Sequence, residues 1–93
     1  MAQVVCDEIT PGLRESERTV AIKDVHGRCQ FLRVRYDFLT PGKDHKFYLT
    51  VGIVHVDPKS KAVLIELPHE ADSGANRLWV WPHDFLESIE ATA

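Results

Sequence analysis

The feature of this sequence that most limits its fold is a series of short apolar runs separated by turn residues. The clearest run alternates apolar and basic side chains: Leu32, Arg33, Val34, Arg35 and Tyr36. Alternation with a period of two residues is typical of a half-buried strand. No long window carries apolar residues at the i, i+3, i+4 and i+7 positions of an amphipathic helix. The sequence therefore predicts an all-β protein.

Turn residues divide the chain into short segments. The predicted strands are 19–25, 30–36, 47–56, 62–67 and 77–81, with 87–89 as a candidate last strand. Residues 40–44 form the clearest loop, and Gly52 predicts a bulge or a tight bend inside the 47–56 strand. Pro82 ends the strand before it, and residues 83–86 are too few for a stable helix and predict a 3₁₀ turn.

The 93 residues are enough for one domain. We expect residues 1–17 to be an irregular lead-in, with at most one short strand at 3–6, and residues 18–93 to form a single small β-barrel. The lead-in mixes short apolar pairs with acidic residues and contains the turn signal Pro11-Gly12. Removing residues 1–16 is then expected to cost little stability.

From Tyr48 onward, the order of segments resembles the SH3-like small barrels, including the KOW and Tudor branches. The segments that carry the resemblance are GIVHVD at 52–57, KSK at 59–61, VLIEL at 63–67 and LWVWPHDFL at 78–86. Tyr36-Asp37-Phe38 is also similar to the tyrosine-aspartate-aromatic signature that opens Src-homology SH3 domains. The resemblance implies a barrel of about five antiparallel strands with a 3₁₀ turn near the C-terminus.

Two departures limit what the resemblance implies about function. Peptide-binding SH3 domains carry a tryptophan at the start of the strand where this chain has Ala62-Val63-Leu64, so their aromatic groove would lack its main wall. Plasmid-type trimethoprim-resistant dihydrofolate reductases contact substrate through a glutamine-isoleucine-tyrosine triplet, where this chain has Trp79-Val80-Trp81. Reductase activity is therefore not implied, and a fold alone does not determine function.

Charge and cysteine content bear on partners and compartment. The net charge of −3 disfavours nucleic acid, because such binding depends on clustered positive charge. Cys6 and Cys29 lack CxxC spacing and are interpreted as thiols in a reducing compartment, although a bridge between them stays open. The chain shows neither a leader-like pattern nor an apolar run long enough to span a membrane. We expect a cytoplasmic protein without membrane contact.

Aromatic residues are the most informative set for function. The candidate binding residues are Tyr36, Phe38, Arg77, Trp79, Trp81, Pro82 and Phe85. Four of them (Tyr36, Phe38, Pro82 and Phe85) occupy positions that resemble the SH3 ligand groove. Tryptophan is enriched at interface hot spots, so the set favours a non-catalytic binding or assembly module that recognises a protein partner or a second copy of itself. An ordinary core role for both tryptophans is the alternative.

Alternation within the 77–81 strand predicts how the tryptophans are placed. Arg77 is unlikely to be buried without a partner, so Leu78 and Val80 should face the core. The SH3 resemblance instead places Trp81 inward, and a bend at Pro82 reconciles the two expectations. We expect Trp79 to be the more exposed ring and Trp81 to be largely covered.

Two other function classes remain as alternatives. A nucleic-acid-binding barrel would use Arg28, Phe31, Arg33, Arg35, Lys43 and Lys46. The favoured interpretation of the same residues is an exposed sheet face that charge keeps soluble and protects from edge pairing. A metal-dependent or oligomeric enzyme is the weaker alternative, because the five histidines show no HxH, HxxxH or CxxC spacing. Whether His69 and His83 converge stays open, and we predict no catalytic residue, metal or cofactor.

Circular dichroism tests the predicted fold class. We expect a β-dominated spectrum, because no window of the sequence has helical apolar periodicity. A helical fraction above about one-third, the average for globular proteins, would contradict the prediction.

Overall fold

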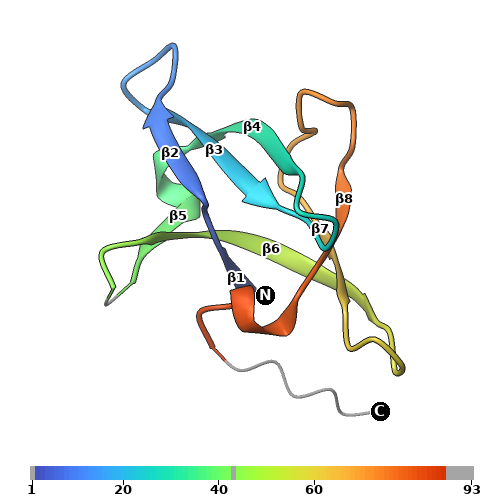
Figure 1. Ribbon diagram of the computed structural model, residues 1–93. Helices are drawn as coiled ribbons and strands as arrows, with labels where there is room; N and C mark the ends of the chain where they lie inside the picture. Colours follow the sequence, from blue (N-terminus) through green and yellow to red (C-terminus); the bar gives the residue numbers. More distant parts are fainter. Residues whose placement is uncertain (1, 43, 88–93) are drawn as a thin grey trace.

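The computed structural model describes residues 2–42 and 44–87. Its strands are β1 (Ala2–Val5), β2 (Glu8–Pro11), β3 (Glu17–Lys23), β4 (Cys29–Arg35), β5 (Leu39–Pro41), β6 (Phe47–Val56), β7 (Val63–Glu66) and β8 (Arg77–Val80) (Figure 1). Two 3₁₀ turns, η1 (Tyr36–Phe38) and η2 (Pro82–Asp84), follow β4 and β8. Every strand pair is antiparallel, and no α-helix occurs in the described residues. The prediction of an all-β protein is confirmed.

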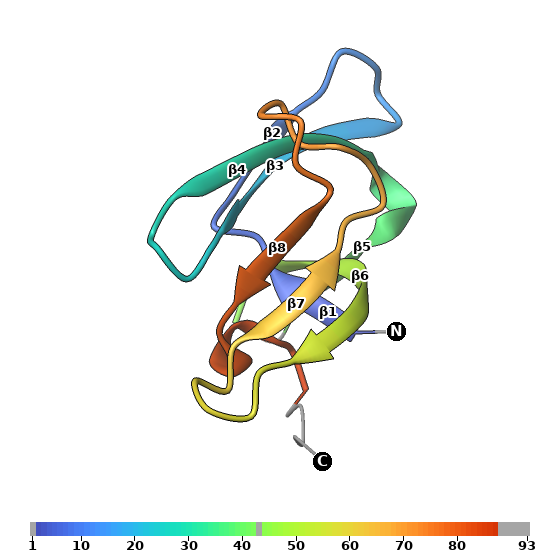
Figure 2. The same cartoon turned by 90° about the vertical axis from the view of Figure 1, so that its right-hand side faces the viewer.

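The strands form two sheets that pack face to face (Figures 1 and 2). One sheet has the order β1-β6-β7-β8, with β5 also paired to β6, and the other has the order β2-β3-β4. The predicted closed barrel of about five strands is not found in the described residues. Where the β3–β4 turn meets β8, a single backbone hydrogen bond of 2.9 Å from Val25 N–H to Trp79 C=O takes the place of a continuous ladder.

The N-terminal residues belong to both sheets, so the predicted irregular lead-in is wrong. β1 pairs with β6, and β2 pairs with β3. Between these strands, Cys6 N–H donates to Phe47 C=O at 2.9 Å, and Asp7 N–H donates to Ala21 C=O at 2.7 Å. Two consecutive residues therefore bond to opposite sheets. The strands were missed because each has only four residues and acidic residues separate them.

The core lies between the two sheets and follows the predicted alternation of side chains. Leu32 and Val34 are buried, whereas Arg33 and Arg35 between and after them are exposed. Fully buried side chains come from both sheets: Val4, Val20, Ile22, Leu32, Val34, Leu49, Val51, Val63, Ile65 and Val80. No buried side-chain nitrogen or oxygen in the described residues lacks a hydrogen-bond partner.

Local features near the predicted turns are confirmed in part. β6 has the predicted bounds, and its register shifts at a bulge between Ile53 and His55, next to Gly52. The predicted loop at 40–44 begins two residues later than expected, because Thr40 and Pro41 belong to β5 and pair with β6. The second 3₁₀ turn begins at Pro82, one residue early, and Phe85 then bridges to Val4. Of the candidate last strand, residues 88 and 89 lie outside the described residues.

Deleting residues 2–11 tests the role of the shared segment. We expect the truncated chain to lose its cooperative unfolding transition in urea, because both sheets lose an edge strand and the core loses Val4. The control is Leu13→Ala in the β2–β3 turn, where the side chain is 82% exposed. This change should alter the free energy of unfolding by less than about 0.5 kcal/mol. If the truncated chain still unfolds cooperatively, at nearly the same urea concentration as the full chain, residues 2–11 contribute little to the fold and the shared-segment account is contradicted.

Candidate binding surfaces

Three side chains line up across the outer face of β6, β7 and β8. The register pairs His55 with Leu64 and Leu64 with Trp79. Their neighbours Ile65 and Leu78 point into the core, so these three side chains point outward. The His55 and Trp79 rings meet edge to face, with centroids 6.2 Å apart and an interplanar angle of 85°. Because β7 separates their strands, the two rings must lean toward each other over Leu64.

The bulge in β6 produces this alignment. Gly52 pairs with Glu66 and Ile53 pairs with Ile65, but the register then shifts so that His55, and not Val54, lies opposite Leu64. A bulge inserts one unpaired residue and re-aims the side chains that follow it. Ile53 and Val54 are left 43% and 40% exposed beside His55. Ile53 pairs with the buried Ile65 and therefore lies on the inner side of the sheet, which leaves Val54 as the neighbour of His55. We call His55, Leu64 and Trp79, with their neighbour Val54, the Trp79 surface.

The burial predicted for the last strand is confirmed. Leu78 and Val80 are buried at 6% and 0% exposure, and Trp79 is 36% exposed. Trp81 is half-buried, so Trp79 is the more exposed ring, as the alternation predicts. His55 and Leu64 were not among the predicted site residues. The signal that would have revealed them is the cross-strand register, which depends on the bulge.

The remaining predicted aromatic residues lie elsewhere. Tyr36 packs on Phe47 with ring centroids 6.4 Å apart, and the Arg18 guanidinium lies 4.9 Å from the centre of the Tyr36 ring. Phe38 meets the ring of His69 edge to face at 6.2 Å. The η1 turn, which carries Tyr36 and Phe38, lies beside β5 and away from β8 (Figures 1 and 2).

The seven predicted binding residues therefore do not form one groove. Arg77 and Trp79 are exposed on β8, whereas Tyr36 and Phe38 belong to η1. Phe85 is buried at 7% exposure and bridges to Val4. Trp81 and Pro82 are half-buried at the start of η2.

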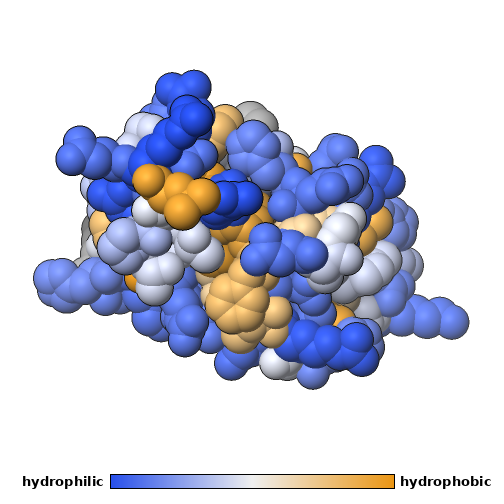
Figure 3. All heavy atoms as spheres, turned by 90° about the horizontal axis from the view of Figure 1, so that it is seen from above, coloured by the Kyte–Doolittle hydropathy of each residue, from blue (hydrophilic) through white to orange (hydrophobic). Residues whose placement is uncertain are grey.

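The predicted basic face is only partly assembled. Phe31, Arg33 and Arg35 point outward from β4, with Phe31 42% exposed. Arg28 is exposed in the β3–β4 turn and Lys46 in the loop before β6, while Lys43 lies outside the described residues. From this side, the molecule is mostly hydrophilic, with small separate apolar areas (Figure 3).

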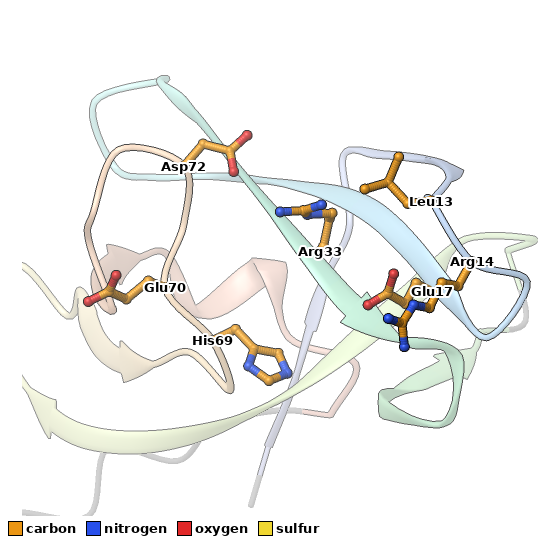
Figure 4. Close-up of a pocket in the computed structure, with 7 residues that line it drawn as sticks. All are labelled: Leu13, Arg14, Glu17, Arg33, His69, Glu70 and Asp72. Carbon is orange, nitrogen blue, oxygen red and sulfur yellow. The ribbon is translucent and has the colours of Figure 1, made fainter.

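Acidic side chains surround the arginines of this face. Arg35 forms an ion pair with Asp37 at 3.1 Å, and both side chains are 67% exposed. Arg33 lies in a cleft of about 410 Å³ between the β2–β3 hairpin and the loop before β8. The residues that line this cleft are Leu13, Arg14, Glu17, Arg33, His69, Glu70 and Asp72 (Figure 4). The cleft therefore presents both signs of charge, and not a continuous basic surface.

The described residues contain no group of three or more His, Cys, Asp or Glu side chains placed to hold a metal ion. His69 contacts Phe38, whereas His83 Nε2 lies 3.4 Å from its neighbour Asp84, so the two histidines have different partners.

Both cysteines are free thiols, which resolves the question of a bridge between them. Burial raises the pKa of the Cys6 thiol to about 12, so Cys6 is an unreactive core residue at neutral pH. Partial desolvation and the nearby Asp7 carboxylate, whose Oδ2 lies 3.7 Å from the thiol, raise the pKa of Cys29. Neither thiol has the lowered pKa of a nucleophilic cysteine.

Comparison with known proteins adds no family assignment. No protein-family model, curated protein or solved structure matches the chain significantly. Within the described part of the chain, no helix has the length and apolar character needed to cross a membrane.

Acrylamide quenching of two single-tryptophan variants tests the Trp79 surface. With Trp81→Phe, the remaining Trp79 should be quenched more strongly than the remaining Trp81 in Trp79→Phe, because Trp79 is the more exposed ring. Trp79→Phe should leave the free energy of unfolding nearly unchanged, whereas Leu78→Ala should lower it by about 2–4 kcal/mol. If Trp79 is shielded as strongly as Trp81 in a verified monomer, the Trp79 surface does not exist as described.

Proposed function

We propose that this protein is a non-catalytic binding module that recognises a protein partner through the Trp79 surface. The observation that carries the proposal is the outward-facing row of His55, Leu64 and Trp79 across three strands. Tryptophan is the residue most typical of interface hot spots, and it fits a position at the centre of an apolar contact.

The supporting strands make this row well suited to binding. A side chain on a sheet is held in place by its cross-strand neighbours, and here the His55 ring rests against the edge of the indole. Little conformational entropy is then lost when a partner covers Trp79. Val54 extends the apolar area along β6, while Arg77 and Glu66, cross-strand partners on β8 and β7, supply a polar border.

We further propose that the two sheets are an open variant of an SH3-like barrel and that the protein works in the cytoplasm. Antiparallel strands, a proline and a 3₁₀ turn after β8 support the first proposal. Two free thiols support a reducing compartment.

Affinity chromatography with matched variants tests the proposed function. The immobilised wild-type chain should retain a partner from its native extract, and Trp79→Ala should lose it, because the substitution removes the centre of the contact. Tyr36→Ala is the control, since Tyr36 is a comparably exposed aromatic residue at 48% exposure on a different surface. Sedimentation equilibrium of the same three proteins tests a second copy as the partner.

Each measurement can support the proposal or contradict it. Retention or self-association that is lost in Trp79→Ala and kept in Tyr36→Ala supports it. Association that survives Trp79→Ala, or that both variants lose equally, contradicts it.

A further inference from the structure

β4 is an edge strand with polar backbone groups directed away from β3. Among the described residues, it pairs with β3 alone. At its two ends, Asp24 N–H donates to Arg28 C=O at 2.9 Å, and Tyr36 N–H donates to Ser16 C=O at 2.7 Å. Because hydrogen-bonded pairs alternate along an antiparallel ladder, the backbone groups of every second residue between these ends point outward. The residues with outward-pointing backbone groups are Cys29, Phe31, Arg33 and Arg35.

The loop before β8 bonds to one end of this edge and contacts η1 beyond the other end, where the rings of His69 and Phe38 meet. Asp72 N–H donates to Phe31 C=O at 2.7 Å, and Ser73 Oγ donates to Gln30 Oε1 at 2.7 Å. The loop thus runs antiparallel to β4 for two residues, like the start of a further strand. Beyond this point, the outward N–H and C=O groups of Arg33 and the outward N–H of Arg35 have no backbone partner within residues 2–42 and 44–87, while the Arg35 C=O precedes η1 as its N-cap.

A cleft lies beside the open part of the edge. Arg33 extends from β4 into the middle of it, with His69, Glu70 and Asp72 of the loop on one side and Arg14 and Glu17 of the β2–β3 hairpin on the other (Figure 4). Three carboxylates line the cleft, but none of the described residues forms an ion pair with the Arg33 guanidinium. Arg33 therefore offers two backbone groups and one cation to the same space.

We propose that the open edge of β4 binds an extended peptide segment of a partner protein. The segment pairs antiparallel to β4 at Arg33 and Arg35, continuing the pairing that Asp72 begins, and places one acidic side chain beside Arg33. Strand addition of this kind uses backbone hydrogen bonds for affinity and alternate side chains for specificity. A carboxylate is the partner that a guanidinium fork recognises best.

The charges around the cleft disfavour the other occupants. A second copy pairing through the same edge would bring Arg33 and Arg35 close to their own counterparts, and like charges that face each other across strands are destabilising. A single strand of nucleic acid would bring successive phosphates to a cleft that contains Glu17, Glu70 and Asp72. A neutral segment with a single acidic residue avoids the first problem and brings one negative charge, and not a series of them, to the cleft. This edge lies on the opposite sheet from the Trp79 surface, so it is a second and separate site.

Peptide binding measured by fluorescence anisotropy tests the proposal. The probe is a short, labelled peptide rich in Thr and Val with one central Glu, compared with the same peptide carrying Lys at that position. A third peptide keeps the Glu but is N-methylated at alternate amides, so it keeps the charge and loses backbone donors. The Glu peptide should bind, and the Lys and N-methylated peptides should bind at least about tenfold more weakly.

Protein variants then locate the site. Arg33→Glu should weaken binding of the Glu peptide about tenfold or more, whereas Arg28→Glu, the same charge change in the β3–β4 turn, should change it by less than about twofold. Trp79→Ala should also leave binding unchanged, which separates this site from the proposed function. In the complex, the Arg33 and Arg35 amides should exchange with deuterium more slowly than in the free protein.

Several results would overturn the proposal. These are no binding of the Glu peptide, equal binding of the N-methylated peptide, equal weakening by Arg33→Glu and Arg28→Glu, and unchanged exchange of the Arg33 and Arg35 amides. If the Glu peptide does not bind but single-stranded RNA does, and Arg33→Glu abolishes the RNA binding, the edge is assigned to nucleic acid instead.

Discussion

The whole structure depends on one segment that hydrogen-bonds to both sheets. Each sheet has one apolar face, which is stable only when the other sheet covers it. Cys6 and Asp7 stand at the crossing and donate to Phe47 of one sheet and Ala21 of the other. Leu86 N–H donates back to Gln3 C=O at 2.9 Å, so the chain after η2 also joins the structure through β1. The segment thus links two sheets that share no continuous ladder of backbone hydrogen bonds in the described residues.

Packing through the inner faces leaves the outer faces and edges available for recognition. On one sheet, the bulge in β6 aligns His55 with Leu64 and Trp79, and the resulting row is supported from below by the core. On the other sheet, β4 has an outer edge that the loop at Asp72 covers only in part. The two surfaces expose different groups: the first offers apolar area, and the second offers backbone hydrogen-bonding groups and a cation. Each can therefore be altered without disturbing the other.

Local patterns in the sequence predict much of this fold, and long-range pairing explains the rest. The alternation of Leu32 and Val34 with arginines identifies β4 and its buried face, and the same rule places Trp79 outside Leu78 and Val80. The strands at Ala2–Val5 and Glu8–Pro11 were missed because four residues give too short a pattern, and only pairing with β6 and β3 makes them strands. In the row at Trp79, the exposed tryptophan was predicted, but His55 and Leu64 were not. His55 joins it through a one-residue register shift; Gly52 indicates a bulge in this strand, but which residue then lies opposite Leu64 depends on the pairing with β7.

Native-state hydrogen exchange of the Cys6 and Asp7 amides tests most directly whether this segment couples the sheets. If it does, both amides should exchange only through global unfolding, with the same free energy as the most protected amides of β3 and β6. Equal values in both sheets would show that neither opens without the other. The account would be contradicted if Cys6 and Asp7 exchange much faster than the core, or if β3 and β6 retain separate, unequal opening energies.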